Sequence, residues 1–180
     1  YSSTNVYVSN CLFISCTSGS EGGALFCSST NLLVESSSFF SCTTSSDLGG
    51  AIHVNGGQCV FYELCGYNCY STYSEGTSYG QFGYIEVTNT ASNKNYVNYS
   101  SIVRCVNQRS DSNNMVYLCS RMVCCPSVNI SMNKCGRYSG ILAIPDTGSS
   151  SVTCSFSYSS FVDNNCSGHI FIHFSRRDAK

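Results

Sequence analysis

The chain has 180 residues, of which 11% are charged, 42% hydrophobic and 13% aromatic, and its net charge is close to -1 at pH 7. This supply of apolar side chains predicts one folded domain over residues 1–180, and it excludes a disordered chain. The balanced charge gives no electrostatic footprint for nucleic acid or for an anionic membrane surface. No apolar run approaches the ~20 residues that a membrane-spanning helix needs.

Cysteine is unusually frequent, with 14 residues. An even number at this density is typical of proteins that fold in an oxidising compartment. Three sequons for N-linked glycosylation, which begin at Asn98, Asn129 and Asn165, are compatible with secretion. We therefore expect an extracellular or cell-surface protein whose signal or anchor lies outside this chain.

The first elements in the chain repeat. Residues Asn10–Cys16 followed by Gly22–Leu25 return as Ser36–Cys42 followed by Gly49–Ile52, a period of 26 to 27 residues. Helix-forming residues are scarce, while Ser, Thr, Val, Ile, Tyr and Phe dominate, so each copy is expected to consist of strands.

The same register predicts six copies along the chain, each with a first strand that ends near an anchor residue. The anchor column reads Cys16, Cys42, Cys69, Cys105, Cys135 and Asn164. Ten and eight residues before it stand the pairs Val6/Val8, Leu32/Val34, Cys59/Phe61, Asn95/Val97, Cys125/Ser127 and Cys154/Phe156. A spacing of two marks a strand with one face turned inward.

A second strand follows in each copy, after a column of small residues. That column reads Gly23, Gly50, Gly83, Asn114, Gly140 and Gly168. Glycine and asparagine adopt a positive φ at low cost, so we expect a tight corner at this column. Units of short strands with no room for a crossover helix bury their apolar faces only by stacking on one another. The sequence therefore predicts an all-β fold, a parallel β-helix of about six coils, with loops chiefly over 70–81 and 88–94.

The paired motifs Phe-x-x-Cys/Asn and Gly-Gly-Ala-Leu/Ile resemble the repeats of chlamydial polymorphic membrane proteins and of related trichomonad surface proteins. Here they are carried by Phe13–Cys16, Gly22–Leu25, Phe39–Cys42, Gly49–Ile52 and, without its Gly-Gly, Phe161–Asn164. The family's usual anchor is Asn, and Cys replaces it in five of the six copies. The resemblance implies a right-handed, pectin-lyase-like β-helix outside the cell with a role in adhesion. It also implies that the repeats are structural, so no catalytic residue is carried over.

The cysteines of neighbouring coils have two interpretations. Stacked positions lie close enough for disulfides, and the pairs would be Cys16 with Cys42, Cys69 with Cys105, and Cys125 with Cys154. Alternatively the column, Cys135 included, is a ladder of buried thiols that pack as small apolar residues. The sequence leaves both open.

Neither a metal site nor a catalytic site is predicted. No Cys-x-x-Cys pair is present, so a structural zinc site has no basis, and no cofactor is expected. Sugar-cleaving enzymes need clustered carboxylates with a basic residue beside them. Glu63, Glu86 and Asp111 belong to different parts of the coil, and the basic residues Arg104, Arg109 and Arg121 fall mostly in loops.

A binding role is suggested by the first long loop, which is rich in Tyr, Ser and Gly. Its residues Tyr70, Tyr73, Tyr79 and Phe82 suit adaptable contacts or sugar stacking. The alternative is that this loop folds over one face and covers the weak position at Gly66.

The sequence thus favours a non-enzymatic structural or adhesive module of a larger surface protein. Its partners would be host or neighbouring surface proteins or glycans. A carbohydrate-binding or carbohydrate-cleaving β-helix is the first alternative, and a filament subunit that stacks end to end through its strand edges is the second.

Overall fold

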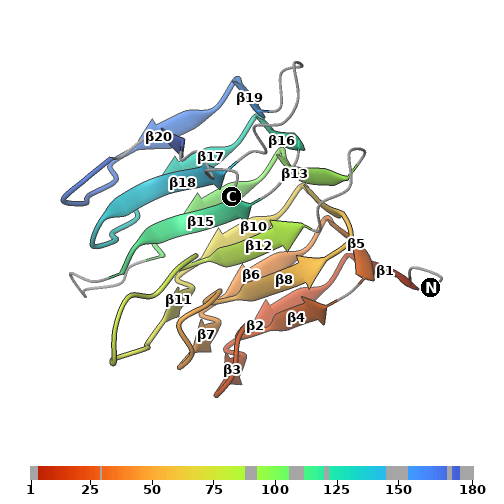
Figure 1. The fold of residues 1–180 in the computed structure, drawn as a ribbon, viewed down its shortest axis with the longest axis horizontal. Helices are drawn as coiled ribbons and strands as arrows, with labels where there is room; N and C mark the ends of the chain where they lie inside the picture. The colour runs from red at the N-terminus through yellow and green to blue at the C-terminus, as the bar shows by residue number, and fades with distance from the viewer. Residues whose placement is uncertain are drawn as a thin grey trace, which may run out of the picture.

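The computed structural model describes residues 4–28, 30–87, 93–105, 112–119, 122–144, 154–169 and 172–174. The described chain contains no helix, and its strands wind into a parallel β-solenoid, as the sequence predicts. Three sheets of six parallel strands run along the solenoid, which confirms the coil number of about six (Figure 1).

Each coil contributes one strand to each long sheet. Sheet A contains β1 (Thr4–Ser9), β5 (Thr30–Glu35), β9 (Cys59–Tyr62), β13 (Lys94–Asn98), β16 (Met122–Pro126) and β19 (Cys154–Ser157). Sheet B contains β2 (Leu12–Ile14), β6 (Ser38–Phe40), β10 (Cys65–Tyr67), β14 (Ser101–Val103), β17 (Asn129–Ser131) and β20 (Ser160–Val162). Sheet D contains β4 (Leu25–Ser28), β8 (Ile52–Gly56), β12 (Gly83–Val87), β15 (Asn114–Cys119), β18 (Tyr138–Ile144) and β21 (Ile172–Phe174). The short sheet C, with β3 (Thr17–Ser18), β7 (Thr43–Thr44) and β11 (Tyr70–Ser71), joins sheets B and D in the first three coils.

The core lies between the three long sheets and is built from the residues that alternate inward along each strand. Val34 of sheet A, Phe39 and Ile102 of sheet B and Ile52 of sheet D are almost fully buried. Phe13 stacks on Phe39 in the next coil with ring centroids 4.7 Å apart. Stacking identical positions therefore buries the apolar face that no single coil could cover by itself.

The corners on either side of sheet B are turned by residues with a positive φ that are not glycine. Between sheets A and B these are Asn10, Ser36, Glu63, Tyr99, Ser127 and Tyr158, and after sheet B they are Ser15, Ser41, Asn68, Arg104, Met132 and Asp163. One left-handed residue at each corner lets the chain change sheets within two residues. At three corners before sheet B a backbone N–H donates to a serine hydroxyl of the next coil, from Cys11 to Ser37, from Leu64 to Ser100 and from Val128 to Ser159.

The glycines of the predicted column do not have the positive φ that the sequence predicts for them. A positive φ occurs at Gly22, Gly49 and Gly80, which precede the expected column. Gly50 instead marks a close approach of coils, because a Cβ there would overlap the backbone oxygen of Gln81. Only glycine fits such a contact, so the two adjacent glycines of the motif serve two different purposes.

The register of coil five also differs from the predicted repeat. Ile102 pairs with Ile130, so Asn133 takes the anchor position that the repeat assigned to Cys135. The two-residue shift is favoured because it buries Ile130 and leaves Met132, 44% exposed, at the corner. In sheet A the same shift pairs Cys125 with Phe156, so the predicted stacking of Cys125 on Cys154 is wrong.

The first long loop does cover the weak position at Gly66. The Phe82 ring fills the space where a side chain on Gly66 would stand, and its edge faces the Phe39 ring at a centroid distance of 6.0 Å. Phe82 is thus part of the core in place of the residue that coil three lacks.

Candidate functional site

The anchor cysteines form a ladder of thiols that hydrogen-bond from coil to coil. The backbone N–H of Cys42 donates to Sγ of Cys69 at 3.4 Å, and that of Cys69 donates to Sγ of Cys105 at 3.3 Å. In return, the Cys69 thiol lies 3.4 Å from the carbonyl oxygen of Phe39 in the coil before. The thiols of Cys69 and Cys105 thus accept a backbone N–H of the preceding coil, and the Cys69 thiol also contacts a backbone carbonyl there.

The ladder continues with asparagine in the last two coils. The N–H of Cys105 donates to Oδ1 of Asn133 at 2.8 Å, and the N–H of Asn133 donates to Oδ1 of Asn164 at 3.0 Å. Nδ2 of Asn133 donates to the carbonyl of Ile102 at 2.9 Å. Cysteine and asparagine therefore occupy the same position and make the same two kinds of contact.

All fourteen cysteines are free thiols in this structure. Hydrogen bonding to Cys105 and burial raise the pKa of Cys69 to about 12, and hydrogen bonding to Cys69 and burial raise the pKa of Cys42. Such thiols remain protonated and react poorly, because the thiolate is the nucleophile. Of the two interpretations of the column, the structure contains the thiol ladder.

Of the remaining candidate cysteines, Cys135 and Cys154 lie outside the ladder. Cys135 is buried, with its Sγ 3.5 Å from Oγ of Ser112. Cys154 pairs with Val123 in sheet A, and burial raises its pKa to about 12. Cys16 begins the ladder in coil one, where the carbonyl of Cys16 accepts the N–H of Thr43.

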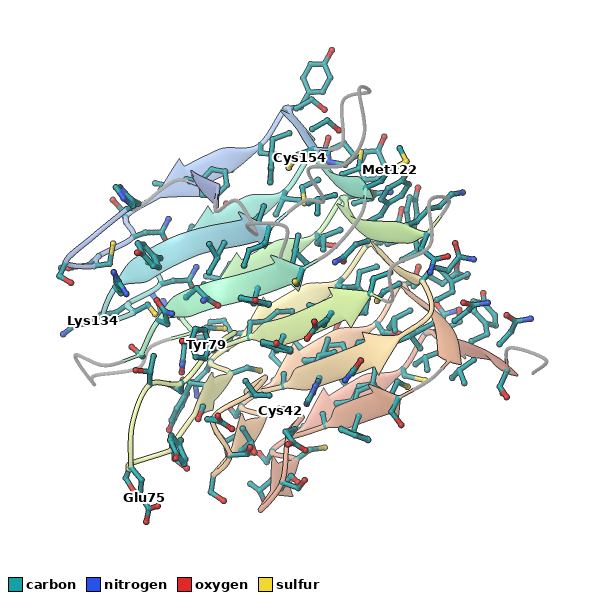
Figure 2. The ribbon with its side chains drawn as sticks, in the orientation of Figure 1. Cys42, Glu75, Tyr79, Met122, Lys134 and Cys154 are labelled. Carbon is teal, nitrogen blue, oxygen red and sulfur yellow. The ribbon has the colours of Figure 1, made fainter. Side chains whose placement is uncertain are left out.

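The tyrosines of the first loop have separate places. Tyr70 belongs to β11 and pairs with Thr43. Tyr73 and Tyr79 are half-buried, and Tyr79 lies where the loop returns toward sheet D, with Glu75 at its far end (Figure 2). Only Tyr79 joins a larger aromatic cluster, through an edge contact with Tyr117 at 6.0 Å.

That cluster is a column on the outer face of sheet D, which the sequence reasoning missed. Phe26, His53, Tyr84 and Tyr117 occupy the same outward position in four successive coils. Their ring centroids are 5.3, 5.2 and 4.4 Å apart, and the two tyrosine rings are nearly parallel. The signal was in the sequence, because the residue between the two inward positions of each second strand is aromatic or histidine in these coils.

Acidic residues act electrostatically on the middle of this column. Burial lowers the pKa of His53 below its ordinary value, while Glu21, Glu86 and Asp47 act on the same imidazole in the opposite direction. His53 is only 5% exposed, and its Nδ1 has no hydrogen-bond partner. The Tyr84 hydroxyl donates to Oε2 of Glu86 at 3.1 Å. We name Phe26, His53, Tyr84, Tyr117, Tyr79 and Glu86 together the aromatic face.

A second feature is a groove of about 550 Å³ on sheet A. It is lined by Asn5, Val6, Tyr7, Asn31, Leu32, Leu33, Gln58, Val60 and Lys94. Tyr7, Leu33 and Val60 are stacked in register and form an apolar floor. Amide side chains and Lys94 line one side, so the groove presents a flat apolar strip beside hydrogen-bonding groups.

The three sequons differ in accessibility. Asn165 is exposed, and its backbone pairs with Lys134. Asn129 is already engaged, because its Nδ2 donates to Ser101 at 3.1 Å and its Oδ1 accepts from Ser160 at 3.0 Å. Asn98 is half-buried at the end of β13, and its Oδ1 is buried.

No metal centre is formed by the part of the chain that the structure describes, because nowhere in it are three His, Cys, Asp or Glu side chains placed so that they could hold a metal ion. Glu63 lies at the corner between sheets A and B, where its carboxylate accepts the hydroxyl of Ser36, whereas Glu86 lies on sheet D. Arg104 donates to the Tyr67 hydroxyl at 3.3 Å. Asp111, Arg109 and Arg121 fall outside the described residues.

Across the described ranges, no helix has the length and hydropathy to cross a membrane. No protein-family profile, curated protein or solved structure matches the chain.

Proposed function

We propose that the chain is a non-enzymatic structural and adhesive module of an extracellular surface protein, and that it binds its partners through the aromatic face. The observation that carries this proposal is the column of four rings in contact from four successive coils, with Tyr79 beside it. Tyrosine and phenylalanine supply large contact areas at low conformational cost and are enriched where proteins bind partners. The resemblance of the repeats to chlamydial and trichomonad surface proteins supports display outside the cell.

The adhesion assay compares matched pairs of substitutions on two faces. Beads coated with the protein are incubated with epithelial cell monolayers and with immobilised matrix proteins. Tyr84→Ala with Tyr117→Ala removes the stacked pair of the aromatic face, and Phe40→Ala with Tyr67→Ala removes a contacting ring pair on the outer face of sheet B. We expect adhesion of the wild type and of the sheet B variant, and loss of adhesion in the sheet D variant. Equal adhesion by all three proteins contradicts the proposal.

The extracellular location is tested by mass. Protein isolated from its source is measured intact, with and without alkylation and with and without glycosidase. We expect glycan mass, first on the exposed Asn165. A chain without glycan recovered from the cell interior would overturn this part of the proposal.

A second candidate is carbohydrate binding in the groove on sheet A. Its flat apolar floor of Tyr7, Leu33 and Val60 suits a sugar ring, and the neighbouring amides of Asn5 and Gln58 suit hydroxyl groups. Neutral oligosaccharides are tested by calorimetry against wild type, Tyr7→Ala and the outward control Tyr62→Ala. Binding that is lost only with Tyr7→Ala supports this candidate, and absence of binding by the wild type removes it.

A further inference from the structure

We infer that the aromatic face recognises an arginine-bearing segment of a protein partner. The inference rests on the proposed function and specifies the chemistry of its partner. It starts from charge, because the Glu86 carboxylate accepts a hydrogen bond from Tyr84 within the column, and Glu21, Asp47 and Glu86 all favour a positive charge at the imidazole of His53. The four basic side chains within the described residues lie elsewhere, on β13, after β14 and in coil five.

The second observation is the polar atom of His53 that lacks a partner. Nδ1 is buried without a hydrogen bond between the rings of Phe26 and Tyr84. A buried polar atom in this state costs free energy until a hydrogen-bonding partner reaches it. Phe26, which covers it on one side, is 50% exposed and has space to turn toward solvent. An incoming polar group would then reach this nitrogen, and the partner for an unprotonated Nδ1 is an N–H donor.

The tyrosine pair favours a guanidinium over an ammonium. A guanidinium is planar, so it donates two parallel hydrogen bonds to a carboxylate while its flat surface packs against the outward edges of the rings, because the faces of the Tyr84 ring are already covered by His53 and Tyr117. The Tyr84 ring and the Glu86 carboxylate lie two residues apart on β12, within hydrogen-bonding distance of each other. A lysine ammonium would reach either group but would not match both with one flat surface.

The chain makes similar contacts within its own fold. The guanidinium of Arg137 lies over the Tyr138 ring at 5.1 Å, and Arg104 donates to the Tyr67 hydroxyl. Those two tyrosines are thus paired with basic side chains, whereas Tyr84 and Tyr117 are stacked on each other beside an acidic group. The aromatic face offers the same chemistry to a side chain from another molecule.

The test uses four synthetic peptides of one Gly-Ser frame that carry three residues of arginine, lysine, citrulline or glutamate. Binding to the full chain is measured by calorimetry at low and at physiological salt. We expect the arginine peptide to bind more tightly than the lysine peptide, and the citrulline and glutamate peptides not to bind. Citrulline keeps the shape of arginine without its charge, so this comparison isolates the cation.

Glu86→Gln is the decisive variant, and Glu63→Gln, on a different corner, is its matched control. Loss of one charge-assisted contact is expected to weaken arginine binding about tenfold in Glu86→Gln and to leave it unchanged in Glu63→Gln. Circular dichroism confirms that both variants fold. Equal weakening by both variants, or equal binding of arginine and lysine peptides, would mean nonspecific charge attraction and would overturn the inference.

The two proposals fail separately. If no arginine peptide binds while Tyr84→Ala with Tyr117→Ala still abolishes bead adhesion, the arginine inference is wrong and the adhesive function stands. If the arginine peptide binds at the aromatic face but adhesion is unaffected by the same pair of substitutions, the face is a binding site and the adhesive function is wrong.

Discussion

At the scale of single residues, the ladder shows that a thiol does the work of a carboxamide at an inner corner. A cysteine has one donor and one acceptor, the two functions that Asn133 uses toward Ile102 and Cys105. The residue before each anchor has a positive φ, which directs the anchor side chain toward the neighbouring coil. The anchor position therefore requires a side chain that can both donate and accept a hydrogen bond, and either a thiol or a carboxamide meets this requirement.

Substitutions at Cys69 separate the hydrogen bonds from the packing. Cys69→Val keeps an apolar side chain but leaves the buried N–H of Cys42 without an acceptor, so we expect a loss of about 1–3 kcal/mol in the free energy of unfolding. Cys69→Asn restores both contacts and is expected to be more stable than Cys69→Val. Urea unfolding of the reduced proteins measures both. A valine variant as stable as the asparagine variant would show that the column is only apolar packing.

The buried imidazole of His53 makes stability depend on pH. Burial lowers its pKa below the ordinary value of 6.5, so the unfolded chain binds the proton more readily than the folded chain. The contribution of His53 to the free energy of unfolding is therefore complete above the pKa that His53 has in the unfolded chain, and it is lost as the pH falls toward the pKa of His53 in the folded chain. Urea midpoints between about pH 7 and pH 5 should decline more steeply in the wild type than in His53→Phe. Parallel curves would show that His53 does not titrate in this range.

At the scale of the elements, most of the fold follows from the sequence and the exceptions have physical causes. The period of two in each copy predicts the inward residues of sheets A and B in the first four coils, from Val6 and Val8 onward. Coil five is misread because matching Cys135 to the cysteine column ignores that Ile130 needs burial more than Met132 does. The aromatic face is missed because its residues recur between the inward positions, whereas the prediction of the core follows the inward positions alone.

The Phe82 ring takes the place of the side chain that Gly66 lacks, and a double substitution tests this replacement. Phe82→Ala removes a ring from the core and should lower the free energy of unfolding by about 3–5 kcal/mol. Adding Gly66→Ile to that variant places a side chain where Phe39 and Ile102 have theirs, so part of the stability should return. Gly66→Ile alone overlaps the Phe82 ring and should destabilise the protein. Thermal unfolding of the wild type, the two single variants and the double variant measures the coupling between the two positions. If the two changes in stability simply add, position 66 and the Phe82 ring do not share the same space.

At the scale of the whole molecule, each coil contacts only its neighbours, so coils are units that can be removed in register. Ser38 pairs with Cys65, an offset of 65 − 38 = 27 residues. Deletion of residues 38–64 therefore brings equivalent corner positions together and should leave a folded, less stable β-solenoid. Circular dichroism and urea unfolding measure the result.

The control for this deletion removes two residues fewer. Deletion of residues 38–62 joins positions that are two residues out of register, so the corner and its left-handed residue no longer coincide with those of coil one. We expect loss of the cooperative unfolding transition in this variant only. Similar unfolding of both deletion variants would mean that register does not govern the stacking of coils.

The direction of the ladder bonds has a consequence for how the chain is made. The backbone N–H of an anchor is satisfied by a side chain from the following coil, never the preceding one. As the chain emerges from the ribosome or passes through a membrane pore, each coil has an unmet donor until the next 27 to 36 residues arrive. We therefore expect the chain to fold one coil at a time. If synthesis or transport stops within a coil, the anchor N–H of the last completed coil remains without its acceptor and can bond to another chain.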